Sequence, residues 1–258
     1  MSLYQQIAFD LPEAVIITGT SSGLGEAVAT SLTKANVKVF GLDIAGKTAA
    51  LDALENYEHF QGDITKTESW NALTEKVKKG NFKHVGLVPC AAITDIDRIL
   101  DVTPERIKKV FDVNILGTIQ ALQAALPLML PNKQGSIVLI GSICATFGEQ
   151  GLPIYSASKA AVRELARTTS LDYARDGIKV NIVSPGPMMA GLFKRHVESV
   201  NDPSFHPKRA NRQPYGKILE VDDVARTILF LLSSGSSALL GADLMADAGL
   251  TTGFDFYS

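Results

Sequence analysis

Short apolar runs alternate along the chain with longer segments that carry apolar residues on one helical face. The short runs are rich in β-branched residues and tend to end in Gly, Asp or Ser. This pattern is typical of strands that are buried on both faces of a parallel sheet. It predicts strands at 14–19, 37–43, 58–63, 84–92, 136–142, 178–186 and about 239–246.

The segments between these strands have helical periodicity. Helices are predicted over 23–35, 67–79, 104–130, 154–175 and 220–233. The third helix has a clear start, because Thr103 is a good N-cap and Pro104 suits the first helical position. Repeated β–α alternation predicts an α/β fold, namely a doubly wound Rossmann-type fold with a seven-stranded parallel sheet and helices on both faces. No Gly/Ser linker divides the chain, so we predict a single domain over 1–258.

The segment 187–217 interrupts this alternation and is predicted to be an excursion over the carboxyl edge of the sheet, where loops usually carry function; the family resemblance described below implies that it is a substrate lid. Its charged residues are Lys194, Arg195, Lys208, Arg209, Arg212 and Lys217, against Glu198 and Asp202, with His196 and His206 besides. A basic lid favours a substrate with a carboxylate, sulfonate or phosphate group. The alternative is a solvated loop whose charges point to water, which is the commoner case for surface charges.

Overall charge and cysteine content narrow the class of protein. The net charge is −2 and the pI is about 6.1, which disfavours a nucleic-acid partner. Uninterrupted apolar runs such as 228–232 are shorter than a membrane span, and the N-terminus lacks the pattern of a signal peptide. Cys90 and Cys144 do not form a disulfide framework, so a reducing, cytoplasmic setting is expected. We predict no metal site.

The stretch TGTSSGLG at 18–25 lies between the first strand and the first helix. In that context Gly19 allows a sharp turn, Gly23 lets the backbone approach a pyrophosphate, and Gly25 permits close helix–strand contact. The helix N-terminus offers free N–H groups to the phosphates. The predicted cofactor contacts here are Gly19, Ser21, Ser22, Gly23, Leu24 and Gly25. An ordinary glycine-rich turn is the alternative.

Asp43 ends the second predicted strand, 24 residues after Gly19. A carboxylate there can accept both hydroxyls of the adenosine ribose and would repel a 2′-phosphate. Ile44 follows, where an enzyme that binds the 2′-phosphate would favour Arg, so NAD is predicted in preference to NADP. A turn acid or helix cap is the alternative for Asp43. Asp63, followed by Ile64, fits either the adenine edge or a turn cap.

Three further segments place chemistry-bearing side chains in register. Tyr155 and Lys159 of YSASK lie one helical turn apart on one face, and Ser142 ends the fifth strand thirteen residues before Tyr155. Asn114 interrupts a long helix, where Asn is locally unfavourable. An ammonium and a nicotinamide cation are expected to lower the pKa of Tyr155 from its usual value near 10. A Tyr/Lys pair alone remains compatible with an exposed helix face.

Together, TGTSSGLG, DVNILG, Ser142 with YSASK, and NIVSPG resemble the classical short-chain dehydrogenase/reductase family over about 14–250. The resemblance implies a catalytic tetrad of Asn114, Ser142, Tyr155 and Lys159, and NAD(P)-dependent alcohol oxidation or carbonyl reduction. It implies that Lys159 also binds the nicotinamide ribose, and that Asn114 holds a water linking Lys159 to solvent. Ser142 is expected to hold the substrate oxygen while Tyr155 exchanges its proton.

The family pattern also suggests contacts beyond the tetrad. Pro185, Gly186 and Met188 in SPGPMM are predicted to border the nicotinamide, although a simple strand terminator is the alternative. Cys90, Ala91 and Ala92 are further cofactor contacts, but Pro89–Ala92 departs from the usual Asn-Asn-Ala-Gly. Because Pro89 lacks an N–H, altered hydrogen bonding of the fourth strand is expected.

Substrate and subunit contacts complete the hypothesis. Ser142, Cys144 and Tyr155 are the predicted substrate-binding residues, with Met188, Met189, Leu192 and Phe193 as an apolar lining or as lid anchors. The apolar faces of 104–130 and 154–175 imply, by resemblance, a homotetramer or homodimer that acts on a small-molecule alcohol or ketone. The competing function is a non-catalytic dinucleotide sensor on the same fold, although such proteins typically lack the Tyr or Lys of the tetrad.

Overall fold

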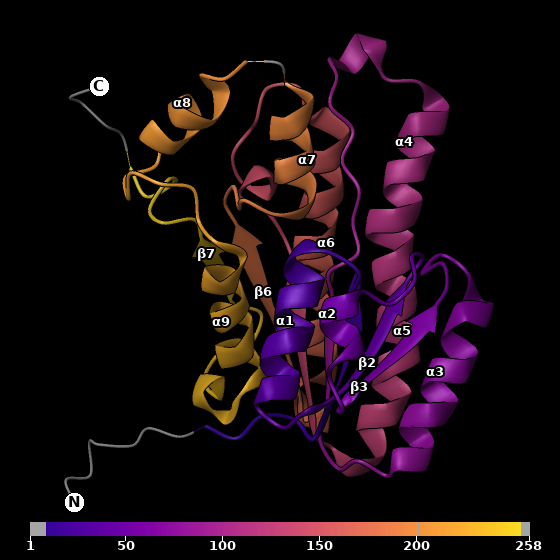
Figure 1. Ribbon diagram of the computed structural model, residues 1–258. Coiled ribbons are helices and arrows are strands. Elements are labelled where there is room, and N and C mark those ends of the chain that lie inside the picture. The colour runs from indigo at the N-terminus through magenta and orange to yellow at the C-terminus, as the bar shows by residue number, and fades with distance from the viewer. Residues whose placement is uncertain (1–8, 201, 254–258) are drawn as a thin grey trace, which may run out of the picture.

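The computed structural model describes residues 9–200 and 202–253, which form a parallel seven-stranded sheet with helices on both faces (Figure 1). The strand order is β3-β2-β1-β4-β5-β6-β7. The strands are β1 (Ala14–Thr18), β2 (Lys38–Asp43), β3 (Tyr57–Gln61), β4 (Val85–Pro89), β5 (Gly135–Ile140), β6 (Ile178–Pro185) and β7 (Asp243–Ala246). The predicted fold class is therefore confirmed.

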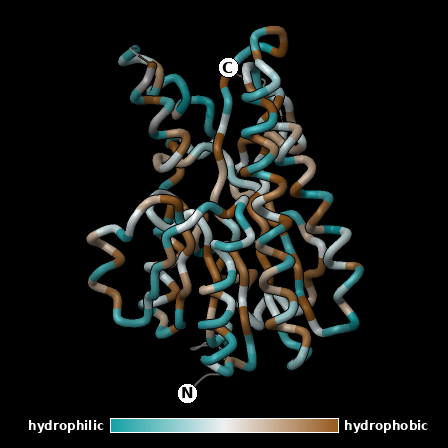
Figure 2. Tube along the Cα trace, turned by 90° about the vertical axis from the view of Figure 1, so that its right-hand side faces the viewer, coloured by the Kyte–Doolittle hydropathy of each residue, from teal (hydrophilic) through white to brown (hydrophobic). Residues whose placement is uncertain are grey.

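The helices divide between the two faces of the sheet. Their bounds are α1 (Gly23–Lys34), α2 (Ala49–Asp52), α3 (Thr67–Gly80), α4 (Pro104–Phe111), α5 (Gly117–Met129), α6 (Pro153–Tyr173), α7 (Gly191–Ser199), α8 (Phe205–Asn211) and α9 (Val221–Leu232). Successive residues of β1 face opposite sides: Val15 and Ile17 pack with α1 and α9, whereas Ala14 and Ile16 pack with α3, α5 and α6. The hydrophobic segments accordingly concentrate along the strands and the inward helix faces (Figure 2).

These two clusters explain why the strand runs are continuously apolar. Ile16 and Ile17 are adjacent in sequence, face opposite layers, and are both fully buried. Burying each such side chain is worth about 1.5–3 kcal/mol. A strand that alternated apolar and polar residues would lose half of this contribution, which is why the pattern predicts a doubly covered sheet.

The predicted helix 104–130 is divided into three parts. Thr103 caps α4 as expected, its hydroxyl accepting a hydrogen bond from Arg106 N at 3.4 Å. A π-helix over Asp112–Leu116 then separates α4 from α5 and contains Asn114. Single π turns are locally unfavourable and are frequent at functional sites. Other differences are smaller: β7 starts at Asp243 rather than near 239, and 187–217 contains the short helices α7 and α8.

The helical run Pro104–Asn132 is, within the described residues, the one stretch long and apolar enough to cross a bilayer, with a mean hydropathy of 1.5 over its best window. In the fold 44% of that window is buried, and α5 contacts β4 and α3. The core helix of a soluble protein meets the same criterion, so length and composition do not establish a membrane span.

The sheet opens at the carboxyl ends of β1 and β4. β1 lies between β2 and β4, so the connections that follow β1 and β4 diverge to opposite faces and leave a crevice. The β1–β4 ladder continues to the Thr18–Pro89 pair, whereas the β4–β5 ladder stops at Leu87–Ile137. Cys90 N donates to Thr18 O at 3.2 Å and therefore points toward β1. The nitrogen of the preceding residue, Pro89, points to the opposite side, toward β5. Because Pro89 has no N–H to donate toward β5, the β4–β5 ladder ends before it although β5 continues to Ile140, which is the altered hydrogen bonding expected of the fourth strand.

Candidate active site

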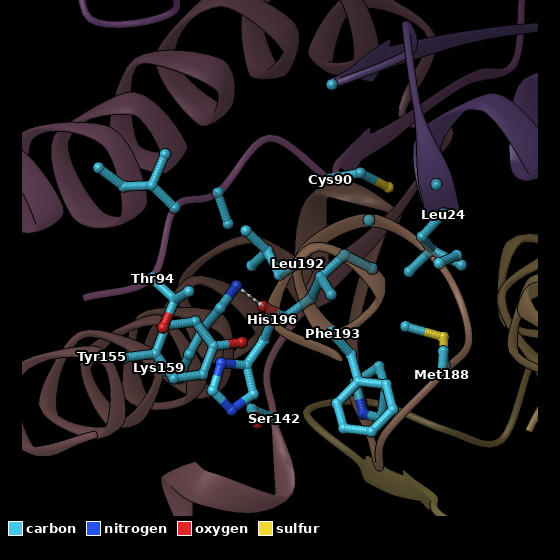
Figure 3. A pocket seen from close by; sticks show the side chains of 18 of the residues that line it. Leu24, Cys90, Thr94, Ser142, Tyr155, Lys159, Met188, Leu192, Phe193 and His196 are labelled. Carbon is cyan, nitrogen blue, oxygen red and sulfur yellow. Dashed lines mark hydrogen bonds between the residues drawn. The ribbon is translucent and has the colours of Figure 1, made fainter. Parts of the chain in front are cut away.

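A cavity of about 780 Å³ lies at this carboxyl edge and is lined in part by residues of α7 and α8 (Figure 3). Most of the predicted site residues line it: Gly19, Ser22, Gly23, Leu24, Gly25, Asp43, Asp63, Ile64, Cys90, Ala91, Ala92, Ser142, Cys144, Tyr155, Lys159, Pro185, Gly186 and Met188. The two predicted residues that do not line it are Ser21 and Asn114. Residues from six separate strand ends thus meet in one pocket.

The glycine loop brings backbone into contact with backbone. Gly19 has φ +73°, and a Cβ there would lie 2.7 Å from Ala91 N. A Cβ on Gly25 would lie 2.1 Å from Gly19 O. The side chain of Ser22, the N-cap of α1, makes no capping hydrogen bond, so the first-turn N–H groups remain open to an anion. The loop therefore fits the pyrophosphate of a dinucleotide.

The Asp43 carboxylate is held in place at the end of β2. Its Oδ2 accepts from Ser21 N at 2.9 Å and its Oδ1 accepts from Ala45 N at 2.8 Å. Ionised carboxylates have about four acceptor sites, so two remain for ribose hydroxyls. Ser21 supports this arrangement from outside the cavity, its hydroxyl donating to Gly46 O at 2.9 Å. In the structure Ser21 thus supports Asp43, and its direct cofactor contact stays a prediction.

Asp63 combines the two roles considered for it. Its Oδ1 accepts from the backbone N and the hydroxyl of Thr65, at 2.9 and 2.8 Å, which is a turn cap. The residue also lines the cavity, and its Oδ2 makes no hydrogen bond within the described residues. Met188 also lines the cavity. It forms an isolated parallel β-bridge with Leu219, between the end of β6 and the start of α9.

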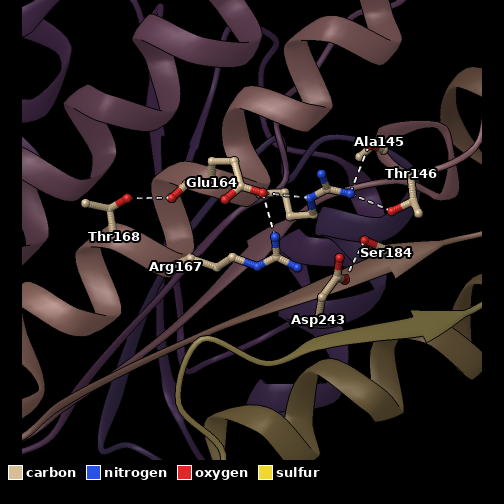
Figure 4. A network of polar contacts seen from close by, with 8 residues as sticks. Ala145, Thr146, Glu164, Arg167, Thr168, Ser184 and Asp243 are labelled. Atoms are coloured by element: carbon tan, nitrogen blue, oxygen red, sulfur yellow. Dashed lines mark hydrogen bonds and ion pairs between the residues drawn. The ribbon is translucent and has the colours of Figure 1, made fainter.

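Ser142 and Tyr155 are brought together by a brace between α6 and the loop after β5. The Ser142 hydroxyl accepts from Cys144 N at 3.1 Å, which fixes the first turn of that loop. Arg163 on α6 donates to Ala145 O at 2.9 Å and to the Thr146 hydroxyl at 2.6 Å (Figure 4). The brace holds the Ser142 loop against the helix that carries Tyr155.

Lys159 is almost fully buried, with 4% of its surface exposed, and its Nζ donates to Ile140 O at 2.8 Å. Burial lowers the pKa of Lys159 to about 8. An ammonium has three N–H donors, so two remain for ribose hydroxyls. The Nζ lies 5.9 Å from the centroid of the Tyr155 ring, on the side of the pocket shown in Figure 3.

The pKa of Tyr155 moves opposite to the direction expected from its neighbour. Desolvation in the pocket raises the pKa of Tyr155 most, and Cys144 and Glu149 raise it further. The Ser142 hydroxyl lowers it in part. Desolvation of the phenolate therefore dominates, and Tyr155 is a protonated phenol in the protein alone.

Asn114 lies behind the wall of the cavity, 1% exposed. Its Nδ2 donates to Ile93 O and to the Ser158 hydroxyl, both at 2.9 Å, and its Oδ1 accepts from Ile93 N at 2.9 Å. The side chain thus ties the β4 connection to α6, with both amide N–H groups used. The water link to Lys159 stays a prediction and would have to use an acceptor oxygen of Asn114.

The lid end of the cavity contains residues that the sequence did not single out. Glu149 Oε2 accepts from the Cys144 thiol at 3.1 Å, and its Oε1 accepts from Arg209 Nη2 at 2.8 Å. Burial raises the pKa of the Cys144 thiol to about 12, so it acts as a donor and not as a thiolate. Glu149 stands in an irregular GEQG stretch, where no local signal distinguishes it from a loop acid. Thr94, Leu152 and Phe205 also line the cavity.

The charges of the lid divide between solvent and cavity. Lys194 pairs with Glu198 at 3.9 Å and Lys208 with Asp202 at 3.7 Å, both on the exposed surface. Arg209, Arg212 and His196 line the cavity, as do Leu192 and Phe193 of the predicted apolar lining. Met189 does not line it, and the side chain of Arg195 lies outside the described part of the structure. Across the described residues, no three His, Cys, Asp or Glu side chains gather as a metal site.

Comparison with known proteins agrees with this geometry. The family model described as Enoyl-(Acyl carrier protein) reductase matches residues 19–251. The chain is 29% identical to 2-(S)-hydroxypropyl-CoM dehydrogenase 3 of Xanthobacter autotrophicus, over 93% of this chain and 96% of that protein. It is 30% identical to the short chain dehydrogenase adrF of Penicillium roqueforti, over 96% and 98%.

Solved structures show the same architecture. The structure of ElxO with NADP bound superimposes with a TM-score of 0.86 at 26% identity. The match covers 94% of this chain and 100% of that chain. The aldohexose dehydrogenase of Thermoplasma acidophilum also gives a TM-score of 0.86, at 27% identity. With the family model, the relatives and the fold in agreement, this chain belongs to the short-chain dehydrogenase/reductase family of oxidoreductases.

Proposed function

We propose that the protein is an NAD-dependent oxidoreductase that interconverts a secondary alcohol and a ketone by hydride transfer. The observation that carries the proposal is the continuity of one cavity. It joins the glycine loop at the start of α1 to the side chains of Ser142, Tyr155 and Lys159. A nucleotide held by the loop thus lies in the same enclosure as a hydroxyl, a phenol and an ammonium suited to carbonyl chemistry.

The residues divide the work on the substrate oxygen and proton. In oxidation the alcohol loses a hydride from carbon and a proton from oxygen, and Tyr155 takes that proton. In reduction Tyr155 gives its proton to the carbonyl oxygen, while the Ser142 hydroxyl donates a hydrogen bond to the same oxygen. Lys159 and the backbone near Met188 would hold a nicotinamide, which would accept or supply the hydride and, when oxidised, would add a positive charge that lowers the pKa of the phenol.

The test of this assignment is Tyr155→Phe, which removes the proton donor and keeps the ring. We expect kcat to fall by about 10²–10⁴ for every alcohol or ketone that the wild type converts. The matched control is Tyr173→Phe on the same helix, which should retain activity. Undiminished turnover by Tyr155→Phe would show that the tetrad assignment is wrong. NAD binding with no turnover of any alcohol by the wild type would instead favour a dinucleotide sensor.

The preference for NAD over NADP is supported by the charges at the end of β2. The ElxO structure carries NADP, so family membership does not determine the cofactor. In this chain the Asp43 carboxylate lines the cavity, and the Ile44 side chain that follows is apolar and 72% exposed. Lys47, the next cation along the chain, is paired with Asp52 at 3.0 Å. A 2′-phosphate would meet a carboxylate without a free cation from this loop.

Replacing Asp43 by Asn measures this preference. We expect kcat/KM for NAD to fall about tenfold or more, because a hydrogen bond to a charged group is lost, and the NADP/NAD ratio to rise. Glu55→Gln removes the same charge from an exposed side chain that does not line the cavity, and should leave the ratio unchanged. A wild-type enzyme with higher kcat/KM for NADP than for NAD would overturn the preference.

Assembly and cellular setting belong to the same proposal. A homotetramer or homodimer is supported by apolar side chains left exposed on the relevant helices, such as Leu116 at 40% and Leu171 at 81%. Light scattering on the purified protein tests this, and a monomer would contradict it. A cytoplasmic setting is supported by two free cysteines, Cys90 and Cys144.

A further inference from the structure

Two of the basic side chains of the lid line the cavity, one of them half-buried and the other exposed. Arg209 and Arg212, in and immediately after α8, both line it. We propose that the substrate carries an anionic group, a carboxylate, sulfonate or phosphate, which binds Arg209 and Arg212 at the lid end of the cavity. This inference rests on the proposed function, since it concerns the substrate of that same reaction.

Arg209 has unused hydrogen-bonding capacity in a confined position. A guanidinium has five N–H donors, and one of them, at Nη2, is given to Glu149 Oε1 at 2.8 Å. Its Nε is buried and has no hydrogen-bond partner within the described residues. The guanidinium carbon lies 5.7 Å from the centroid of the Phe193 ring. A buried, unsatisfied N–H of a charged group is costly, and an oxyanion of the substrate would satisfy it.

Glu149 compensates only part of the positive charge at this end. The Glu149 carboxylate is shared between the Cys144 thiol and Arg209, so it meets the guanidinium through a single oxygen. Arg212, three residues after Arg209, makes no ion pair within residues 9–200 and 202–253. Counting Arg209 and Arg212 as +2 and Glu149 as −1 leaves a local charge of +1. A substrate with one negative charge would neutralise it.

The lining between the two polar ends suggests the shape of the substrate. Ser142 and Tyr155 mark the end where the alcohol or ketone reacts, and Leu192 and Phe193 of α7 add apolar surface beside them (Figure 3). The arrangement fits a hydroxy or keto compound whose reacting carbon is joined to an oxyanion by an aliphatic spacer. A wholly neutral alcohol would leave the Arg209 Nε without a partner.

The experiment compares a hydroxy acid with its methyl ester, together with the sulfonate and phosphate of the same carbon skeleton. We expect wild-type kcat/KM to be higher for at least one of the three anions than for the ester. Arg209→Met keeps an apolar stem over Phe193, and should lower kcat/KM for that anion by about 10- to 100-fold while lowering it far less for the ester. Arg212→Met should have a smaller effect of the same kind, because its side chain is exposed.

Two controls show whether the loss of activity comes from the charge in the pocket, from the charge of the lid in general, or from a change in the structure of the lid. Lys208→Met removes the same charge from the same helix, but its side chain faces solvent and Asp202, so activity on anion and ester should be unchanged. Because Arg209→Met leaves Glu149 unpaired beside Tyr155, the comparison is repeated with Glu149→Gln in both proteins. The anion-selective loss should persist in that background.

Binding without turnover keeps this inference distinct from the proposed function. Calorimetric titration of the Tyr155→Phe protein, saturated with NAD, with a non-reacting aliphatic carboxylate, sulfonate or phosphate should show binding that weakens on Arg209→Met. A wild type that prefers the ester, equal losses on anion and ester, or an equal loss in Lys208→Met would overturn the anion site. If anions bind through Arg209 but no alcohol is converted, the proposed function fails and the site stands.

Discussion

The two ends of this cavity are built from different parts of the chain and by different kinds of contact. At the cofactor end, backbone meets backbone: Gly19 lies against Ala91, and Gly25 lies against Gly19 O. At the lid end, a side chain meets a side chain sixty residues away, as Glu149 holds Arg209. Close contact between backbones allows almost no residue other than glycine, whereas a contact between two side chains allows many residue types. We therefore expect a single added methyl group to disturb stability and cofactor binding at the cofactor end. At the lid end we expect substrate turnover to depend on changes of charge.

The largest effect is expected from adding one methyl group at the cofactor end. Gly25→Ala places a Cβ 2.1 Å from Gly19 O, and the contacted atom is backbone, so the loop must shift. We expect the free energy of unfolding to fall by about 3 kcal/mol, as in severe overpacking. The NAD dissociation constant should rise at least about tenfold. Chemical denaturation and NAD titration measure the two effects.

A second glycine provides the matched control for this substitution. Gly46 follows β2, has an ordinary φ, and a Cβ there would meet no atom within 4 Å. Gly46→Ala should therefore change both quantities only slightly. Similar losses for Gly25→Ala and Gly46→Ala would show that close backbone contact does not distinguish the cofactor end.

An intermediate effect is expected where the two ends meet, at Lys159. Burial lowers the pKa of Lys159 to about 8 in the folded protein, against an ordinary value of 10.5. Between these values the unfolded chain binds more protons than the folded one, so this residue makes stability rise with pH. From about pH 7.5 to 9.5 the contribution amounts to about 2 kcal/mol. The cost of burying the ammonium is fully present below pH 8 and is relieved as the pH rises.

The measurement is the difference in unfolding free energy between the wild type and Lys159→Met at the two pH values. The Cys90 and Cys144 thiols, whose pKa values are raised to about 12 by burial, titrate differently on unfolding in both proteins and largely cancel in this difference. The wild type should gain stability relative to the variant as the pH rises. A constant difference would mean that burial does not perturb the pKa of Lys159.

The same contrast explains how far the sequence could predict the molecule. The fold follows from continuous apolar strands, and the glycine loop and the positions of Ser142, Tyr155 and Lys159 follow from short motifs whose geometry is local. Glu149 and the division of the lid charges could not be predicted, because they depend on where α8 packs across the cavity. The raised pKa of Tyr155 in the protein alone could not be predicted either, since desolvation depends on the whole enclosure, and the lowering expected with a bound nicotinamide cation stays a prediction. The contact of the Asn114 amide with the backbone of Ile93 could not be predicted for the same reason, and the water link of Asn114 stays a prediction.

The smallest effect is expected where the lid touches the glycine loop. Gly191, the first residue of α7, has φ +52° and lies against Gly23, whose own Cβ would stand 3.1 Å from Gly191 Cα. A Cβ on Gly191 itself would make only an ordinary contact of 3.9 Å with Gly23 Cα. Gly191→Ala should therefore cost only the strain of a left-handed alanine, about 1 kcal/mol of unfolding free energy.

Gly216 separates this strain from the contact with the loop. It lies in the same lid with φ +72°, and a Cβ there would meet no atom within 4 Å. Gly216→Ala should lose about as much stability as Gly191→Ala, and both should leave the NAD dissociation constant within about threefold of the wild type. Only Gly191→Ala should raise the KM of the substrate, because Gly191 lines the cavity at the start of α7 and Gly216 does not line it. If Gly191→Ala weakened NAD as strongly as Gly25→Ala, the lid and the glycine loop would form one mechanical unit, and the distinction between the two ends of the cavity would not hold.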